Sequence, residues 1–318
     1  MTQPNPFFIV GSPRSGTTLL RFILSSHSRL YVPDETGFIP FLRKQPHTDL
    51  SLSEVDAILT RIGQLNRFWD GMVPDVGAFY HALPQPRLPF VLEALFQQRL
   101  APHGAVRWGD KTPLYVRYVP TIRALFPQAK FIHMVRDGRD ATLSAAKKWA
   151  AGKPYMDSYY LLTNWRRNVE AGWAAQKLLG DDYLELRYET LVTEPETAVS
   201  QLCTFLNEPF EPAMLDQTGL ARQVGGGIDE HVEVQRQINS QSVGRWQQEM
   251  PLFEQKLANH LIGSTLQQAG YPLADVPPFT PAERLTLARL AAKFTLADTT
   301  RSLLYKTGLR TLNANRRK

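Results

Sequence analysis

The chain has 318 residues, of which 43% are hydrophobic and 21% charged, a composition that is ordinary for a soluble globular protein of one large α/β domain or two smaller ones. Its single cysteine, Cys203, excludes an intrachain disulfide and a metal site built from clustered cysteines. No apolar run approaches the roughly 18 residues of a membrane span, and the N-terminus has no export-signal pattern, so we expect a cytoplasmic protein without a transmembrane segment.

The net charge of +6 is concentrated at the C-terminus, where residues 301–318 hold six basic and no acidic residues. The rest of the chain is formally neutral, which argues against a general nucleic-acid-binding face. The tail could contact an anionic membrane surface or RNA, or it could be a solvated terminus. The basic residues are Arg301, Lys306, Arg310, Arg316, Arg317 and Lys318.

The first predicted element is a strand over residues 7–10, because a continuous apolar run is typical of a strand buried on both faces. A turn with Gly11 and Gly16 follows, and then a helix over 19–24. The spacing is that of the phosphate-binding G-x-x-x-x-G-K-[ST] loop, but Thr17 stands where the lysine is expected.

Such a loop offers several backbone N–H groups and the positive end of a helix to one anion. In nucleotide hydrolases the lysine contacts the terminal phosphates and a Ser/Thr hydroxyl helps to hold magnesium. Here Thr17 replaces the lysine and Arg14 lies inside the loop. The exchange suits a transferable group that is less charged than a γ-phosphoryl group, such as a sulfuryl group, and that needs no metal.

Residues 36–107 are predicted to form a helical insertion that shapes an acceptor cleft. It contains helices at 51–65 and 89–100, with an aromatic segment between them. This segment, NRFWDGMVPDVGAFY at 66–80, could line an apolar acceptor pocket or could be core.

Two further strand-helix units follow. A strand at 130–135 leads to a helix through Trp149, and a strand at 183–188 leads to a helix that ends near Leu206, with Thr193 as its N-cap. Strands that alternate with helices predict a central parallel sheet in a three-layer α/β fold of the P-loop type.

The C-terminal part is predicted to contain a flexible glycine-rich loop at 223–230 and a long helix. A capping box at 280–283 begins this helix, which should run toward Tyr305. We therefore divide the chain into a main domain, residues 1–275, and a basic helical extension, residues 276–318, which could pair two chains.

Arg136 closes the second predicted strand, and Ser144 lies about two helical turns beyond it. Ligands of open parallel sheets bind at such strand ends, and an arginine with a hydroxyl suits a phosphate monoester. The alternative for Arg136 is a surface ion pair with Asp137 or Asp140.

Two segments resemble PAPS-dependent sulfotransferases, where PAPS is 3′-phosphoadenosine-5′-phosphosulfate. PRSGTTLLR, 13–21, resembles their 5′-phosphosulfate-binding loop, and VRDGRDATLS, 135–144, their 3′-phosphate-binding segment. The resemblance implies PAPS as co-substrate and no metal. It assigns cofactor binding to Arg14, Ser15, Gly16, Thr17, Thr18, Arg136 and Ser144.

The resemblance extends over about residues 7–270, toward the branch of tyrosylprotein sulfotransferases and their bacterial relatives. It places Glu35 of DET, 34–36, as the catalytic base and Lys111 of RWGDKTP, 107–113, beside the transferring group. Further cofactor-binding positions are Tyr188 in RYETL, 187–191, and Arg245 in INSQSVGRW, 238–246.

The chemistry gives each residue type a role. An acceptor hydroxyl loses its proton as it attacks sulfur, so a carboxylate whose pKa is raised by burial can act as base, as the resemblance implies for Glu35. Arg14, Lys111 and the loop amides would stabilise charge on the departing phosphate. Without the resemblance, Glu35 reads as a surface carboxylate and Lys111 as a solvated lysine.

Several other residues have structural interpretations. His133 lies mid-strand in an apolar context and reads as a core histidine, and Cys203 lies on the apolar face of a helix. The seven histidines show no zinc-binding spacing. Four tryptophans could stack on adenine or pack in the core: Trp149, Trp165, Trp173 and Trp246.

Other functions remain open at this point. A P-loop kinase or nucleotide phosphotransferase would need magnesium and a loop cation, and Thr17 argues against it. A non-catalytic adenylate-binding protein would share the loop without turnover. For a sulfotransferase, the acceptor hydroxyl could belong to a peptide tyrosine, a carbohydrate or a small molecule.

Overall fold

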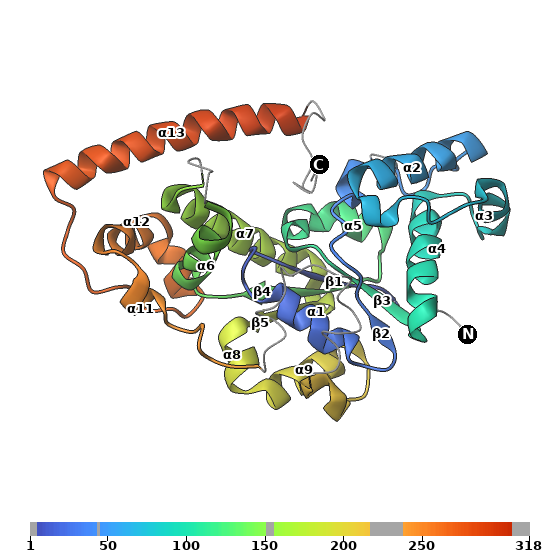
Figure 1. Cartoon of the computed structure of the whole chain (residues 1–318), viewed down its shortest axis with the longest axis horizontal. Helices are drawn as coiled ribbons and strands as arrows, with labels where there is room; N and C mark the ends of the chain where they lie inside the picture. Colours follow the sequence, from blue (N-terminus) through green and yellow to red (C-terminus); the bar gives the residue numbers. More distant parts are fainter. Residues whose placement is uncertain (1–4, 43–44, 151–155, 217–237, 307–318) are drawn as a thin grey trace.

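The computed structural model describes residues 5–42, 45–150, 156–216 and 238–306, and the predicted loop at 223–230 lies outside these residues. Its centre is a five-stranded parallel sheet with the strand order β2-β3-β1-β4-β5 (Figure 1). The predicted P-loop-type α/β fold is therefore confirmed. The strands are β1 Phe7–Gly11, β2 Leu30–Tyr31, β3 Arg107–Lys111, β4 Lys130–Val135 and β5 Tyr183–Arg187.

Two of the five strands were not predicted. β2 has only two residues, which is too short for a periodic pattern. β3 has the sequence RWGDK, whose charged residues hide it from a search for apolar runs, although all five residues are buried. The burial of the charged residues in β3 depends on ion pairs and hydrogen bonds with distant segments, and a pattern of neighbouring residues does not show these contacts.

Helices cover both faces of the sheet. α1, α8 and α9 lie on one face, and α5, α6 and α7 lie on the other, which gives the predicted three layers (Figure 1). The α-helices are α1 Thr17–Ser25, α2 Leu52–Leu65, α3 Val76–Ala82, α4 Leu88–Leu100, α5 Val119–Leu125, α6 Gly138–Ala145, α7 Ser158–Leu179, α8 Tyr188–Thr193, α9 Pro195–Leu206, α11 Trp246–Glu249, α12 Leu252–Gln268 and α13 Pro281–Lys306.

The apolar run of β1 supplies both faces of the core. Phe8 and Val10 join one hydrophobic cluster with α4, α5 and α7, whereas Phe7 and Ile9 join another with α1 and α9. Successive side chains of a strand point to opposite faces, so a strand covered on both sides is apolar at every position. This is why β1 was readable from sequence.

The insertion is helical, as predicted, and contains α2, α3 and α4. Part of the aromatic segment is core, and its role in an acceptor pocket stays a prediction. Trp69 and Phe79 are buried in the core, whereas Met72 and Val73 line a cavity of about 190 Å³ within the insertion. Phe68 is 37% exposed.

The predicted third unit needs a correction at its turn. β5 ends at Arg187, and the short helix α8 intervenes before α9. Thr193 is the last residue of α8, and its hydroxyl donates to the carbonyl of Glu189, so its prediction as an N-cap is wrong. Helical propensity at 188–193 was masked by the strand pattern that precedes it.

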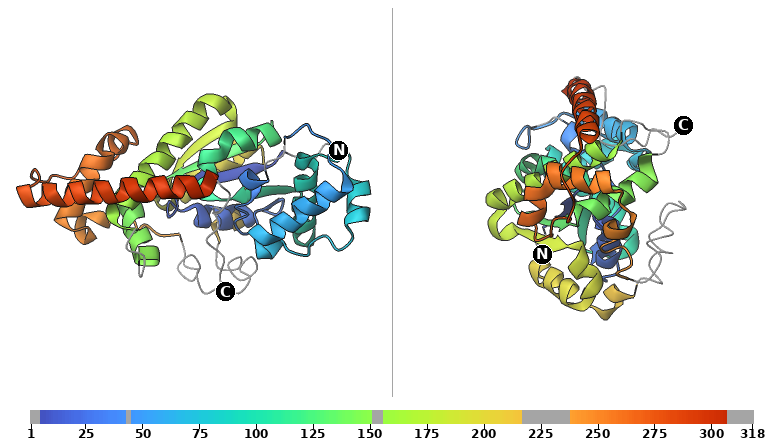
Figure 2. Two further views of the ribbon diagram at one scale, coloured as in Figure 1. Left: turned by 90° about the horizontal axis from the view of Figure 1, so that it is seen from above. Right: turned by 90° about the vertical axis from the view of Figure 1, so that its left-hand side faces the viewer.

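The long helix α13 begins with the predicted capping box, in which Thr280 N donates to Glu283 Oε2 at 2.7 Å and Glu283 N to Thr280 Oγ1 at 3.3 Å. It lies along the outside of the molecule (Figure 2). Ion pairs join it to the body, including Lys256–Glu283 at 2.9 Å and Arg167–Asp298 at 3.0 Å. Within the described ranges, no helix has the length and apolar character that crossing a bilayer requires.

A glycine of α7 provides a test of the packing between helix and sheet. A Cβ atom on Gly172 would overlap the ring of His133, which is buried and bonded to the Tyr183 hydroxyl at 2.6 Å. Gly172→Ala should lower the free energy of unfolding by about 1–3 kcal/mol, despite alanine's helix propensity. Gly263→Ala in α12 is the matched control, because its Cβ meets only an ordinary contact at 3.4 Å. It should gain up to about 1 kcal/mol in urea unfolding; equal changes in both variants would contradict this packing.

Candidate functional site

The carboxyl ends of all five strands lead into predicted site residues. The strand order reverses direction beside β1, whose neighbours are β3 and β4, and ligands of open parallel sheets bind at such a position. The segments involved are Arg14 to Thr18 after β1, Glu35 after β2, Lys111 at the end of β3, Arg136 after β4 and Tyr188 after β5.

The loop between β1 and α1 requires unusual backbone conformations. Gly16, at the N-cap of α1, has φ 91°, and a Cβ there would overlap the ring of Tyr188. Arg14 has φ 68°, which is uncommon for a residue other than glycine and costs of order 1 kcal/mol or more. Such strain is typical of a ligand-binding loop.

The loop residues differ in accessibility. Thr17 is 3% exposed and Ser15 fully buried, and the Ser15 hydroxyl has no hydrogen-bond partner among the described residues. Thr18 is half-buried and lies 3.4 Å from Lys111 Nζ through its hydroxyl. Lys111 thus reaches the start of α1 from β3.

Arg14 connects the two sequence motifs. Its Nε donates to the hydroxyl of Ser144 on α6 at 3.0 Å, and its guanidinium lies 5.8 Å from the ring centre of Trp149. The predicted helix through Trp149 continues beyond α6 as a π-helical turn, Ala146–Ala150, which is a form frequent at functional sites. The two motifs, 130 residues apart, therefore form one site.

Arg136, directly after β4, binds the loop between β1 and α1. Its Nη1 donates to the carbonyl of Arg14 at 3.1 Å and its Nη2 to the carbonyl of Ser242 at 2.6 Å. Its guanidinium lies 4.4 Å from the centre of the Tyr188 ring. The Nε is buried and has no partner in the part of the chain that the structure describes, so this N–H is not used by the protein.

The surface ion pair considered for Arg136 does not form. Asp137 instead binds Arg139 through both carboxylate oxygens, at 2.9 and 2.7 Å. Asp140 accepts from the backbone N–H groups of Gly244 and Trp246, at 2.7 and 2.8 Å, and burial raises its pKa. Asp140 positions the segment around Arg245 against α6, a role that its sequence did not reveal.

Arg245 makes a bidentate pair with Glu249, with both distances at 2.7 Å. Hydrogen bonds from Arg245 and Lys147 lower the pKa of Glu249 to about 2. The segment of Arg245 reaches the loop through the Ser242 carbonyl, which Arg136 binds.

Glu35 and Lys111 form an ion pair, with Nζ to Oε1 at 2.6 Å. The Lys111 side chain is 3% exposed, whereas that of Glu35 is 44% exposed. The expected burial of the base is therefore wrong for this structure. Glu35 differs from a solvated surface carboxylate by its buried cationic partner, which comes from a strand that the sequence did not reveal and also lies beside the loop residue Thr18.

The residues interpreted as structural are buried. His133 is fully buried in contact with Tyr183, and burial raises the pKa of the Cys203 thiol to about 11. Trp165 is 2% and Trp246 7% exposed, and both pack in the core. Among the tryptophans considered for stacking on adenine, Trp149 is the one described beside Arg14.

The described residues contain no group of three or more His, Cys, Asp or Glu side chains suited to a metal ion.

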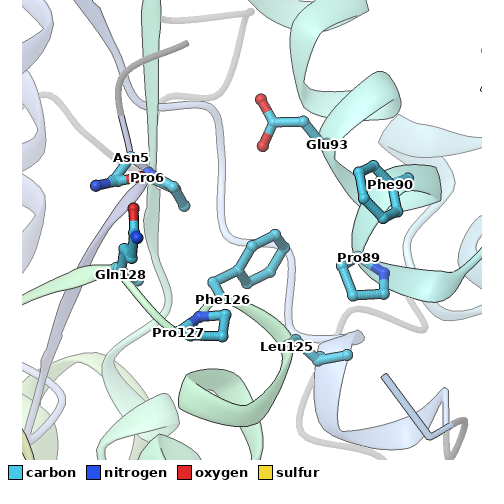
Figure 3. A pocket seen from close by; sticks show the side chains of 10 residues that line it. Asn5, Pro6, Pro89, Phe90, Glu93, Leu125, Phe126, Pro127 and Gln128 are labelled. Carbon is cyan, nitrogen blue, oxygen red and sulfur yellow. The ribbon is translucent and has the colours of Figure 1, made fainter. Parts of the chain in front are cut away.

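A cavity of about 350 Å³ is lined by residues at the amino ends of the strands, whereas the loop lies at their carboxyl ends (Figure 3). Pro6 directly precedes β1 and Ala129 directly precedes β4. Half of its lining residues are proline or phenylalanine, and Glu93 lies at one side (Figure 3). It is separate from the residues predicted for the donor.

A sequence model of the sulfotransferase family matches residues 6–212, which include the loop, Glu35, Lys111, Arg136 and Tyr188. The chain belongs to the sulfotransferase family. Its reaction is therefore the transfer of a sulfuryl group to a hydroxyl acceptor. This assignment replaces the alternatives of a kinase and of a non-catalytic adenylate-binding protein.

Individual relatives agree with the branch that the sequence indicated. This sulfotransferase is 30% identical over 290 residues to protein-tyrosine sulfotransferase 1 of Danio rerio, covering 88% of this chain and 76% of the relative. It is 27% identical over 260 residues to the protein-tyrosine sulfotransferase of Drosophila melanogaster, covering 77% of this chain and 47% of the relative.

Solved structures support the fold of the sulfotransferase. The sulfotransferase domain of the curacin biosynthetic pathway matches with a TM-score of 0.60 at 23% identity, over 86% of this chain and all of that domain. The sulfotransferase domain of a Synechococcus olefin synthase matches with a TM-score of 0.56 at 22% identity, over 86% of this chain and 98% of that domain.

Proposed function

We propose that the enzyme uses PAPS as its sulfuryl donor, with Glu35 as general base and without a metal ion. The observation that carries the proposal is the meeting of Arg14, Lys111 and Arg136, from three strand ends, around one glycine turn. The partnerless buried Nε of Arg136 fits a ligand oxygen. Sulfotransferase family membership favours the same donor.

The donor would be held at both of its anionic ends. The loop amides, Arg14 and the Thr17 and Thr18 hydroxyls suit the 5′-phosphosulfate, and the N-terminus of α1 favours negative charge there. Arg136 and Ser144 suit the 3′-phosphate, and the ring of Tyr188 lies between Gly16 and Arg136. Arg245 is proposed for the nucleotide on the resemblance alone.

In the proposed reaction, the carboxylate of Glu35 accepts the proton of the acceptor hydroxyl. The acceptor oxygen forms a bond to sulfur while the bond from sulfur to the 5′-phosphate oxygen breaks. Lys111 and Arg14 stabilise the negative charge that develops on that phosphate oxygen. The products are the sulfated acceptor and adenosine 3′,5′-bisphosphate, and the accepted proton leaves Glu35 to solvent.

A tyrosine hydroxyl is the first acceptor that we propose, because the relatives named above are protein-tyrosine sulfotransferases. A carbohydrate or small-molecule hydroxyl would be the other outcomes of an acceptor screen with ³⁵S-labelled PAPS. Cytoplasmic location, pairing of two chains through the helical extension and membrane contact through its basic end stay predictions.

Donor binding tests the proposal without an acceptor. Calorimetry should detect binding of adenosine 3′,5′-bisphosphate in the presence of EDTA, since no metal takes part. Arg136→Lys should weaken this binding about 10- to 100-fold, because lysine cannot keep both carbonyl contacts of the guanidinium and also offer the Nε donor to the 3′-phosphate. Binding of 5′-AMP, which lacks the 3′-phosphate, should weaken less. Binding of ATP that requires magnesium, with no binding of the bisphosphate, would contradict the proposal.

A further inference from the structure

The segment that carries Glu35 is held by two successive residues of β3. Lys111 pairs with Glu35, and the preceding residue, Asp110, accepts a hydrogen bond from the hydroxyl of Thr36 at 2.5 Å. Successive side chains of a strand point to opposite faces. The two contacts therefore hold neighbouring residues of this segment from the two sides of β3.

Asp110 is the end of a buried chain of hydroxyl groups. Thr112 donates to its other oxygen at 2.8 Å, and the Tyr115 hydroxyl lies 2.7 Å from that of Thr36. The N–H of Ile39 donates to the Tyr115 oxygen at 3.0 Å. When Asp110 is ionised, every donor in this chain has an acceptor. The Ile39 N–H donates to Tyr115, the Tyr115 hydroxyl to Thr36 and the Thr36 hydroxyl to Asp110.

The backbone of the same segment is fixed from the insertion. The side-chain amide of Asn66 donates to the carbonyls of Glu35 and Thr36, at 2.7 and 3.1 Å. The Glu35 carboxylate is half-exposed, but the next residue, Thr36, is fully buried and hydrogen-bonded through its hydroxyl and its carbonyl. The position of the base therefore depends on buried groups that touch no reactant.

We propose that Asp110 is a positioning residue for sulfuryl transfer, which acts through Thr36 to hold Glu35 against Lys111. The inference rests on the proposed role of Glu35 as base. An asparagine at position 110 could accept a hydrogen bond from one of the two threonine hydroxyls through its amide oxygen. Its NH₂ group would face the other hydroxyl, which already donates a proton toward position 110. One donor would then lose its acceptor, and the segment would shift.

The charge of Asp110 gives the arrangement a pH dependence. Burial raises the pKa of this carboxyl to about 7; hydrogen bonds from Thr36 and Thr112 and the charge of Lys111 lower it, while the charge of Glu35 raises it. Ionised Asp110 accepts both hydroxyl protons, so alignment of Glu35 should fail as pH falls below about 7. This adds an acidic limb to the rate profile of the wild-type enzyme.

The experiment uses the full chain with Thr36→Val, Thr36→Ser and Asp110→Asn. The readout is conversion of ³⁵S-labelled PAPS, with a tyrosine peptide or with water as acceptor, beside calorimetry of adenosine 3′,5′-bisphosphate. Thr36→Val and Asp110→Asn should lower kcat about 10- to 100-fold, with bisphosphate affinity within about twofold of wild type, because a misplaced base costs up to about 10²-fold. Thr36→Ser keeps the hydroxyl and should restore the rate.

Tyr183→Phe is the control for a buried hydroxyl lost outside the site, because Tyr183 bonds to His133 beneath α7. It should change the melting temperature and leave kcat unchanged. Wild-type kcat in folded Thr36→Val, equal losses in Thr36→Ser and Thr36→Val, or an acidic limb near pH 7 that persists in Asp110→Asn would each overturn the inference. A fully active Glu35→Gln, or a wild type that converts no PAPS, would instead overturn the proposed function on which it rests.

Discussion

Glu35→Gln should lower kcat about 10²–10⁴-fold, because the amide cannot take the proton of the acceptor hydroxyl as the oxygen attacks sulfur. The affinity for adenosine 3′,5′-bisphosphate should change little, since Arg14 and Arg136, which we propose as donor ligands, do not bind the Glu35 side chain in the contacts described above. Steady-state kinetics with ³⁵S-labelled PAPS and calorimetry with the bisphosphate separate the two effects.

Asp34→Asn is the matched control for Glu35→Gln. Asp34 is the preceding residue of the same loop, also carries a half-exposed carboxylate, and pairs with Arg21 at 2.5 Å. Its replacement should leave kcat within about threefold of wild type and lower the melting temperature, because Arg21 is buried and loses its charged partner. Equal kcat for wild type and Glu35→Gln would remove Glu35 from the chemistry.

Lys111→Met should lower kcat about 10²–10³-fold, because it removes the ammonium that we propose to stabilise the leaving phosphate oxygen. Methionine fills a similar volume at this buried position, so the fold should persist. Glu35 loses its partner in the same variant, and both effects act on the chemical step. The measurement is single-turnover conversion of labelled PAPS at saturating acceptor.

Lys130→Met provides the control, since Lys130 lies at the opposite end of β4 and pairs with Asp182 at 3.7 Å. It should keep the wild-type rate. A Lys111→Met enzyme that loses bisphosphate affinity but not kcat would assign Lys111 to donor binding alone. The same substitution with no effect on either quantity would exclude Lys111 from the site.

The sequence by itself determined the parts of the protein whose signals are local. The apolar run of β1, the glycine spacing after it and the arginine that ends β4 were all readable because a strand buried on both faces needs apolar residues and a phosphate-type loop needs glycine. The capping box of α13 was readable in the same way. These features led to the family before any contact was known.

Only the tertiary structure decided which residues surround Glu35. β3 is buried, yet it carries arginine, aspartate and lysine. The burial of these three residues is explained by partners at positions 5 and 206 for Arg107, 36 for Asp110 and 35 for Lys111. No pattern along the chain encodes those pairings. The expectation that the base is buried was wrong for the same reason: exposure depends on how the insertion packs, not on the residues beside Glu35.

Sequence and tertiary structure differ in what they reveal, because a local pattern reflects the average environment of one segment, whereas an ion pair or a chain of hydrogen bonds joins segments far apart in the sequence. The division of the chain between residues 275 and 276 and the roles of the individual site residues stay predictions. Asp110 illustrates the difference. In the sequence it is one charged residue before Lys111. In the structure it is a buried carboxyl that accepts hydrogen bonds from the hydroxyls of Thr36 and Thr112.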